Sequence, residues 1–551
     1  MVSKFIRSAQ FRTRTWAESW RNSSDLARIE DFIRDREQQN PPQGSPILFF
    51  NASTRIWGLS LNAAFSQLAA WGLRLAGLPV LHYVCNQGME QCVLGAIHSG
   101  LLSKPPCRGC IRLSRNLYSQ ERTLTLTQPS KKTSLLDELE ELHTVKELSQ
   151  FTVDGLPLGQ LCLPSVRWVL RMHSLKDDYG TLELFKRFIR SSAHIASHFS
   201  GVVQEVKPRA IVVFNGISYP EAVVREIGMR NDVPVITHEV GVRPNSAFFT
   251  RGHATAYPID IDDDYTLSSE EETKLDRYLS ERFGGDFSMA GIHFWPSMEA
   301  LGEKLTDRLG EFDQAVSVFT NVIFDTSQIH ANTTFADMFV WLRGIVEFAR
   351  ENPDTLFVIR AHPDELRPGK ESKETVEGAL IDAGAFDMPN IQFISPREFI
   401  NSYELIRRSK LVLVYNSTIG LEATLLRKPV ICGGKARYAQ YPTVYFPGTR
   451  REYFDLARSL LKQTDPGVPD EFFQQARRYT FFQHFLTSLD FSNFLYPHKF
   501  FPGYIRFRKF DPGLLDPAIS EEIEVLKNGI LHNEQFIYQA QVSTGQNKRR
   551  G

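Results

Sequence analysis

Two hydroxyls, a glycine and a single carboxylate follow an apolar run that starts at Leu411. The run LVLVY is followed by NSTIG at positions 416–420, and Glu422 is the one acid in the next apolar stretch. A strand that ends here and leads into a helix presents unpaired backbone N–H groups at the positive end of the helix dipole. Hydroxyls add donors there, and glycine lets a ligand approach the backbone. The pattern is typical of a phosphate-binding turn.

Glu422 would lie one turn inside this helix, where its carboxylate could accept hydrogen bonds from ribose hydroxyls. The alternative is ordinary capping, with Ser417 or Thr418 as the N-cap residue. A capping box needs an acid three residues after the hydroxyl, and those positions hold Gly420 and Leu421. The sequence therefore favours phosphate and ribose binding over capping.

A histidine–proline pair follows a second strand-like run, TLFVIR at 355–360. Pro363 biases His362 towards an extended backbone, and the imidazole could then donate to a phosphate or to a leaving-group oxygen. By itself the pair also fits an ordinary turn, but it precedes the Ser-Thr helix start in the same predicted domain. Lys435 and Arg437 are candidate cations for a diphosphate or an acidic sugar, with a solvated basic loop as the alternative.

All these residues follow predicted strands, and ligands of open α/β sheets bind beyond the carboxyl ends of the strands. The candidate phosphate- and ligand-binding residues are Thr320, Asn321, Arg360, His362, Pro363, Asn416, Ser417, Thr418, Gly420, Glu422, Lys435 and Arg437.

The elements that must position these residues alternate between apolar strand-like runs and helical periodicity. One series covers residues 46–84 and 210–241, and a second covers 315–434. Continuous apolar strands that alternate with helices predict parallel sheets covered on both faces. We therefore predict an α/β protein with two Rossmann-like, doubly wound domains that face a cleft. The predicted parts are a helical extension at 1–44, a first domain with a helical insertion at 45–300, a second domain at 310–460, and a helical region with a tail at 465–551.

The first domain has its own candidate acid in the run VPVITHEVG. His238 and Glu239 lie at the predicted strand exit. A carboxylate that faces the second domain there could act as a general base and activate a hydroxyl, with His238 beside it. The pair could equally form a structural hydrogen bond. The aspartates at 260–264 are interpreted as a solvated acidic loop, and no catalytic metal and no required cofactor are predicted.

The composition is that of an average soluble protein. The chain has 551 residues, 42% hydrophobic and 23% charged, with a formal net charge of -1, so no nucleic-acid partner is expected. No apolar run approaches the ~20 residues of a membrane span, and no secretory signal is present. A cytoplasmic location is expected. The cationic, aromatic N-terminus is predicted to be a helix that packs on the first domain or makes peripheral contact with the inner membrane.

Four of the six cysteines are clustered as C-x6-C-x14-C-x2-C. Without a secretory signal, disulfides are not expected. The cluster is either a structural zinc site or a set of buried free thiols. Its members are Cys85, Cys92, Cys107 and Cys110.

The motifs RAHP, YNSTIGLEA and KPVICGG, preceded by THEVG, resemble the bacterial capsule polysaccharide biosynthesis glycosyltransferases over roughly residues 205–450. These are GT-B enzymes related to Kdo transferases and bacterial sialyltransferases. The resemblance implies that His362, Pro363, Ser417 and Thr418 bind the nucleotide and phosphate of a CMP-sugar. It also implies that Glu422 holds the ribose, and that the base is the acid of the first domain, for which Glu239 is the candidate.

These observations predict a glycosyltransferase that moves a sugar from a nucleotide-sugar donor to a surface polysaccharide or glycolipid acceptor. Two alternatives remain open. A sugar-nucleotide epimerase of GT-B type would use the same loops of the second domain but release a free sugar. A non-catalytic assembly or export protein would keep the fold and show no affinity for nucleotides.

Overall fold

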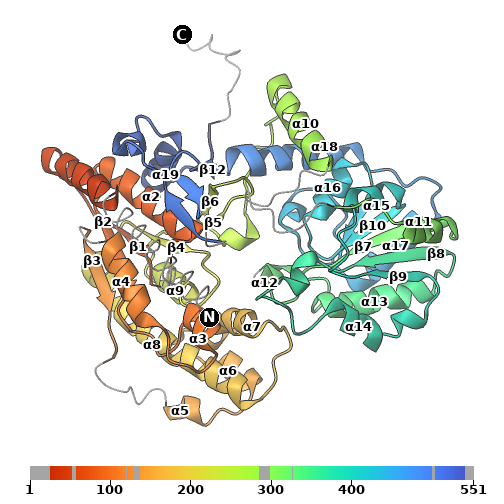
Figure 1. Cartoon of the computed structure of the whole chain (residues 1–551), viewed down its shortest axis with the longest axis horizontal. Coiled ribbons are helices and arrows are strands. Elements are labelled where there is room, and N and C mark those ends of the chain that lie inside the picture. Colours follow the sequence, from red (N-terminus) through yellow and green to blue (C-terminus); the bar gives the residue numbers. More distant parts are fainter. Residues whose placement is uncertain are drawn as a thin grey trace, which may run out of the picture. The chain divides into compact units, whose positions relative to one another are not determined.

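The computed structural model describes residues 25–52, 58–118, 121–129, 137–284, 298–325, 327–498 and 503–539. The chain divides into two compact units (Figure 1). Within the described ranges, unit 1 comprises the residues up to Val169, Lys176–Ala254 and Thr487–Tyr538. Unit 2 consists mainly of Leu170–Leu175 and Thr255–Leu486.

Unit 1 is built on a seven-stranded sheet with the order β12-β6-β5-β4-β1-β2-β3. The five strands from β5 to β3 are parallel, and β6 and β12 extend the sheet in antiparallel pairing. The strands are β1 (Ile47–Phe50), β2 (Val80–Cys85), β3 (Thr123–Leu126), β4 (Ala210–Phe214), β5 (Val235–Val240), β6 (Ser246–Thr250) and β12 (Leu489–Asp490). A separate antiparallel pair joins β13 (Leu495–Pro497) to β14 (Ile505–Phe507).

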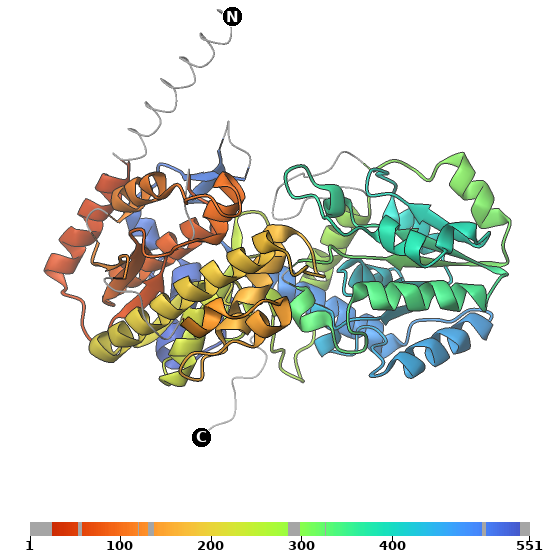
Figure 2. The same cartoon turned by 90° about the horizontal axis from the view of Figure 1, so that it is seen from below.

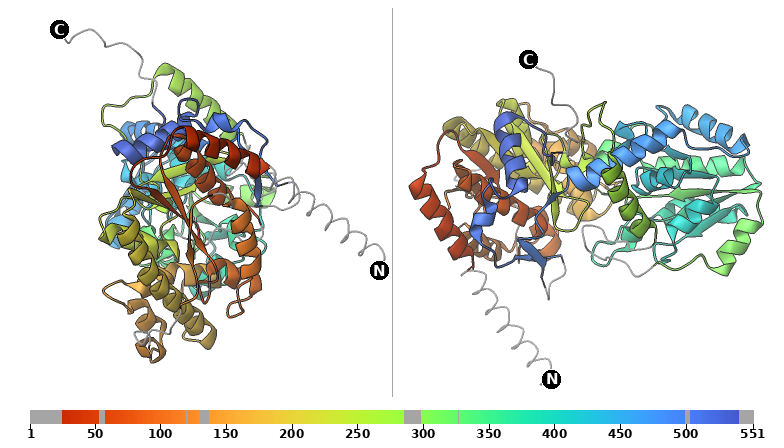
Figure 3. Two further views of the ribbon diagram at one scale, coloured as in Figure 1. Left: turned by 90° about the vertical axis from the view of Figure 1, so that its left-hand side faces the viewer. Right: turned by 90° about the horizontal axis from the view of Figure 1, so that it is seen from above.

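Helices cover both faces of this sheet. On one face, α2 packs against α19 so closely that a Cβ on Gly72 would collide with Ile523 (Figure 3). On the other face, the long helix α8 packs against α9 (Figure 2). The N-cap Asp178 accepts from Thr181 N and fixes the start of α8. The helices are α2 (Leu61–Leu75), α3 (Val93–Ser99), α4 (Cys107–Leu117), α5 (Asp137–Glu140), α6 (Val145–Gln150), α7 (Leu158–Leu170), α8 (Tyr179–Val206), α9 (Glu221–Arg230) and α19 (Glu521–His532).

Unit 2 is built on a five-stranded, all-parallel sheet with the order β11-β10-β7-β8-β9. The strand order reverses between β7 and β10, as it does in doubly wound folds. Every residue of β8 and β10 is buried, because helices cover both faces. The strands are β7 (Gln314–Phe319), β8 (Thr355–Arg360), β9 (Ile391–Ile394), β10 (Leu411–Val414) and β11 (Val430–Cys432).

In unit 2, α13 and α14 lie on one face of the sheet, and α15 and α16 lie on the other (Figure 1). The predicted fold class is confirmed as an α/β protein with two units, each built on a sheet that is mainly or wholly parallel. The helices are α10 (Ser269–Phe283), α11 (Glu303–Gly310), α12 (Gln328–Ala331), α13 (Met338–Arg350), α14 (Val376–Asp382), α15 (Ser402–Arg408), α16 (Ile419–Leu425), α17 (Arg450–Lys462) and α18 (Asp470–Phe481).

The boundaries of the two units differ from the predicted domains at two places. The main segment of unit 2 begins at Thr255, well before the predicted start of the second domain at residue 310, and it includes α10. The C-terminal region does not stay helical, because Thr487–Tyr538 returns to unit 1 and adds β12 to the edge strand β6. Residues 25–39 form a helix as expected, whereas residues 1–24 and the tail from 540 lie outside the described part. None of the described helices is long and apolar enough to cross a membrane.

A buried polar network ties the helix at 25–39 to α2 in unit 1. Arg74 Nη1 donates to Glu30 Oε2 at 2.8 Å, and Trp71 Nε1 donates to both Glu30 and Glu121. The imidazole of His82 contacts the same Glu121 carboxylate. Burial, followed by the charge of Glu121, raises the pKa of Glu30 from 4.5 to about 8. Glu30 is therefore largely protonated at neutral pH.

We predict that Glu30→Gln flattens the pH dependence of stability. A carboxyl group with a raised pKa stabilises the fold fully below its unfolded pKa, and this contribution is lost as pH rises through about 8. One proton contributes a slope of at most about 1.4 kcal/mol per pH unit. From pH 5 to about 8 the melting temperature of wild type should fall relative to that of Glu30→Gln, which stays neutral at every pH, whereas Glu226→Gln, in a partly exposed pair with Arg230, should run parallel to wild type. If the melting temperature of Glu30→Gln changed with pH in parallel with that of wild type, the raised pKa of Glu30 would be contradicted.

Candidate functional site

A pocket of about 710 Å³ opens at the carboxyl edge of the unit 2 sheet. Its walls come from the ends of β7, β8 and β10, so it lies where the strand order reverses. This is the position at which open α/β sheets bind ligands. Seven of the predicted residues line it: Thr320, Arg360, His362, Pro363, Ser417, Thr418 and Glu422.

Arg360, the last residue of β8, brings a buried positive charge to this pocket. Its exposed fraction is 4%, and its guanidinium makes no hydrogen bond or ion pair with another described residue. Burial lowers the pKa of Arg360 to about 10, and the attraction of Glu398 offsets only part of this effect. The side chain stays charged at neutral pH. A buried charge without a counter-charge is unfavourable, so this pocket is suited to an anionic ligand.

Ser417 and Thr418 stand at the start of α16, as the sequence predicted. Thr418 is the N-cap residue, but its side chain makes no capping hydrogen bond. Within the described part of the chain, neither hydroxyl hydrogen-bonds to the protein. Neither side chain therefore caps the helix. Both residues line the pocket, where their hydroxyls can donate to a ligand.

His362 has the predicted extended backbone, with φ −68° and ψ 132°. Its Nδ1 accepts a hydrogen bond from Asp364 N at 3.1 Å, so in the neutral ring the proton is on Nε2. Burial lowers the pKa of His362, and the nearby Arg360 charge lowers it further, although Asp364 acts in the opposite direction. His362 can therefore act as a neutral hydrogen-bond donor.

Glu422 also lines the pocket, but its carboxylate is engaged by protein groups. Arg282 donates to Oε1 through Nε at 2.9 Å and through Nη2 at 2.6 Å, and the Tyr403 hydroxyl donates to Oε2 at 3.0 Å. Glu422 fixes Arg282 and Tyr403 in the pocket wall, and its expected ribose contact stays a prediction. Sequence reasoning missed these two residues. A lone acid in an apolar stretch does indicate a buried partner, but nothing in the sequence around Arg282 identifies it as that partner.

Five predicted residues do not line the pocket. Asn321 N donates to Met338 Sδ, Asn416 Oδ1 accepts from Gln328, and Lys435 is exposed. Arg437 Nε donates to the carbonyl of Thr255 at 3.1 Å, and its guanidinium lies over the Tyr257 ring. Gly420 is required by packing, because a Cβ there would collide with the Tyr438 hydroxyl. The predicted ligand approach at Gly420 and the predicted anion contact of Arg437 are therefore replaced by internal contacts.

The candidate acid of unit 1, at the carboxyl end of β5, is held by two side-chain amides and by the Val240 N–H, which donates to Glu239 Oε1 at 2.9 Å. Asn62 Nδ2 donates to Glu239 Oε1 at 3.2 Å, and Asn215 Nδ2 donates to Oε2 at 3.0 Å. The amide of Asn215 is itself oriented, because its Oδ1 accepts from Ile217 N. Glu239 therefore has a fixed carboxylate at a strand exit.

His238 does not join Glu239, which corrects the predicted catalytic pair. The side chain is buried between Phe214 and Phe249, with ring centroids 6.0 and 5.3 Å away. Burial lowers the pKa of His238 to about 3, so the ring is neutral. Adjacent residues of a strand point to opposite faces, and here Glu239 takes the polar side.

The four clustered cysteines line one pocket of unit 1, away from the residues described above. Burial raises the pKa of Cys85 to about 11 and of Cys92 to about 12, as expected for protonated thiols. In the described part of the chain, no three His, Cys, Asp or Glu side chains are already arranged to hold a metal ion. The zinc alternative stays a prediction.

Residues 299–442 match the family described as "Capsule polysaccharide biosynthesis protein". This segment contains all seven predicted residues that line the pocket, so the recognised family resemblance is confirmed there. The chain is also 26% identical, over 237 residues, to "Protein FixF" of Sinorhizobium fredii (strain NBRC 101917 / NGR234). The match covers 41% of this chain and 49% of the relative, so the chain spans about half the length of that relative.

Two solved structures are among those to which the chain is similar at low sequence identity. The first is Thermosulfurimonas dismutans KpsC, beta Kdo 2,4 transferase, at 14% identity and a TM-score of 0.34, covering 54% of this chain and 84% of that chain. The second is the UDP-GlcNAc 2-epimerase from Neisseria meningitidis, at 13% identity and a TM-score of 0.25, covering 78% of this chain and 94% of that chain.

We predict that Glu422→Gln destabilises the protein in the absence of any ligand. The substitution leaves Arg282 without its counter-charge in a site where both side chains are largely buried. Breaking a buried ion pair costs about 3–5 kcal/mol, and the lower end applies at a pocket wall. Chemical denaturation measures the loss. Glu347→Gln, which breaks an exposed pair with Arg450, should cost less than about 1 kcal/mol. Equal stabilities of Glu422→Gln and wild type would restore Glu422 as a pure ligand contact.

Proposed function

We propose that this chain is a glycosyltransferase that binds a nucleotide-sugar donor, with a CMP-sugar favoured, in the unit 2 pocket. The acceptor would be a surface or capsular polysaccharide or a glycolipid. The observation that carries the proposal is the buried, unpaired Arg360 guanidinium beside the hydroxyls of Ser417 and Thr418. The capsule polysaccharide biosynthesis match over the same residues supports it.

The pocket groups suit the charge that develops during sugar transfer. As the bond between the anomeric carbon and the phosphate oxygen breaks, the leaving nucleotide gains negative charge. Arg360 would stabilise that charge through charge-assisted hydrogen bonds. Ser417 and Thr418 would donate to further phosphate oxygens, and the Nε2–H of neutral His362 would donate to the leaving oxygen.

In this proposal, the second group required for transfer is a base for the acceptor hydroxyl. Glu239 would take the hydroxyl proton as the oxygen attacks the anomeric carbon. Asn62, Asn215 and the Val240 N–H fix the direction of the carboxylate, so it does not need to reorient before it accepts the proton. The proton ends on Glu239, and the new glycosidic bond replaces the sugar–phosphate bond.

We predict that one nucleotide among CMP, UDP, GDP and TDP raises the melting temperature, and we expect CMP. At 100 times its dissociation constant, a ligand stabilises the fold by about 2.7 kcal/mol. Arg360→Met should weaken binding about tenfold to a hundredfold, because hydrogen bonds to charged groups contribute about 1.5–3 kcal/mol. Ser417→Ala and His362→Ala should also weaken it.

Arg343→Met, on the exposed side of α13, is the matched control and should bind like wild type. If no nucleotide stabilises the protein, the donor site is contradicted and a non-catalytic assembly role is favoured.

We predict that Glu239→Gln separates chemistry from donor binding. Loss of a general base should slow transfer about 10²–10⁴-fold, whereas stabilisation by the nucleotide should be unchanged, because Glu239 belongs to the other unit. Release of labelled sugar to an acceptor measures turnover. Wild-type rates in the variant would contradict the base assignment, and a free sugar as the main product would favour an epimerase.

A further inference from the structure

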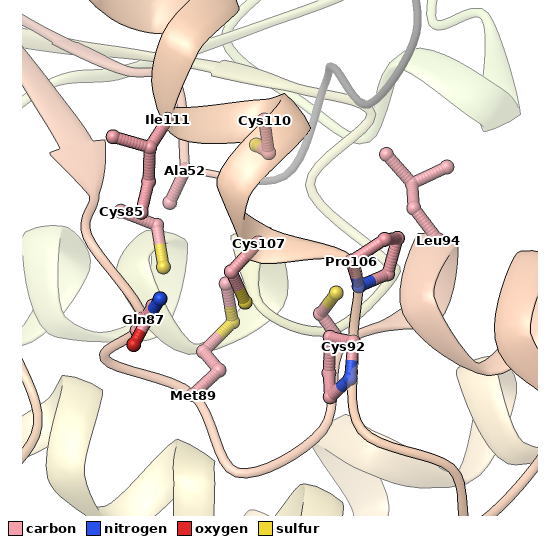
Figure 4. A pocket seen from close by; sticks show the side chains of 11 residues that line it. Ala52, Cys85, Gln87, Met89, Cys92, Leu94, Pro106, Cys107, Cys110 and Ile111 are labelled. Carbon is pink, nitrogen blue, oxygen red and sulfur yellow. The ribbon is translucent and has the colours of Figure 1, made fainter.

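Four of the six cysteines converge on one apolar pocket of unit 1, and the nucleotide proposal does not use them. Cys85 ends β2, Cys92 is the N-cap residue of α3, and Cys107 and Cys110 lie in the first turn of α4. They line a pocket of about 430 Å³ together with the thioether of Met89 (Figure 4). Thiols from three elements are thus gathered into one space.

A built scaffold holds the segments that carry these cysteines. Gln91 is fully buried, and its Nε2 donates to the carbonyls of Leu101 and Ser103 at 2.8 and 2.9 Å. The turn before Cys92 is therefore joined to the loop that leads to Cys107. A Cβ on Gly95 would lie 2.7 Å from the Pro105 Cβ, so glycine is needed for this close approach.

A backbone N–H group is directed at one of the sulfur atoms. Gly95 N donates to Cys92 Sγ at 3.2 Å, which is the N-cap hydrogen bond of α3. Donors directed at sulfur stabilise the thiolate form, which is the form that binds a metal. A buried neutral thiol is a weak acceptor and gains little from them.

The sulfur atoms are not yet arranged as a ligand set within the described residues. A cysteine Sγ moves through roughly 3 Å when χ1 changes between staggered rotamers. The pocket has apolar walls and room for such rotations. A metal ion would therefore draw in the side chains without unfolding the scaffold.

We propose that Cys85, Cys92, Cys107 and Cys110 bind one structural Zn²⁺ as a tetrahedral set of thiolates. Four thiolates at about 2.3 Å suit Zn²⁺, and a Cys-x-x-Cys pair is a common half of such sites. The ion would join β2, α3 and α4 at the carboxyl edge of the unit 1 sheet. This inference does not depend on the proposed glycosyltransferase activity.

Metal analysis of the full-length chain, purified under reducing conditions, tests the site. We expect about one zinc per chain in the wild type, and loss of most of it in Cys85→Ser and in Cys107→Ser. The matched controls are Cys162→Ser and Cys432→Ser, which remove buried cysteines of other sites and should keep the zinc.

A second measurement avoids reliance on variants that fail to fold. Wild-type protein in which Co²⁺ replaces zinc should show sulfur-to-metal charge-transfer absorption and the visible bands of tetrahedral cobalt. Chelation should lower the melting temperature, and added Zn²⁺ should restore it. Metal-free wild-type protein that remains folded and gains neither stability nor cobalt absorption would overturn the proposal. Stoichiometric iron in place of zinc would overturn the identity of the metal.

Discussion

The buried guanidinium of Arg360 is the interaction on which the account of unit 2 depends. A charge with 4% exposure and no hydrogen bond or ion pair to its guanidinium among the described residues is costly unless something else neutralises it. The sheet nevertheless places it firmly, because the Thr320 amide and hydroxyl both donate to its backbone carbonyl. The end of β8 is therefore fixed by the fold, while its charge is left for a ligand. Two hydroxyls and a neutral imidazole surround the same space.

A second arginine in the pocket shows the contrasting case. The Arg282 side chain is nearly as buried, but it forms an ion pair with Glu422, and the same carboxylate accepts a hydrogen bond from the Tyr403 hydroxyl. The Arg282–Glu422 ion pair forms part of the pocket wall, and its two charges neutralise each other, so it offers no net charge to a ligand. The difference between a paired and an unpaired cation separates a residue that forms the pocket wall from the one that we propose binds a ligand. It also explains why Glu422, which looks like a binding residue in the sequence, has a structural role in this structure.

The sequence alone predicted the strands and the residues that directly follow them, because both depend on local apolar patterns. Apolar runs gave β7, β8 and β10, and parallel strands necessarily bring Thr320, Arg360 and Ser417 to one edge. Period-two alternation along β5 also places His238 and Glu239 on opposite faces of the sheet. Contacts across long sequence separations could not be predicted. Three features depend on tertiary packing that no local pattern encodes. They are the packing of Tyr438 against Gly420, the ion pair between Arg282 and Glu422, and the return of Thr487–Tyr538 to unit 1.

Titration calorimetry with CMP and with cytidine is the first measurement to make, because it asks whether Arg360 binds a phosphate. The two ligands differ only in the phosphate, so the ratio of their affinities reports its contribution. The account predicts that wild type binds CMP at least about tenfold more tightly than cytidine. In Arg360→Met the ratio should fall close to one, with cytidine affinity unchanged. An equal ratio in both proteins would show that the phosphate is not bound by Arg360 and would contradict the account.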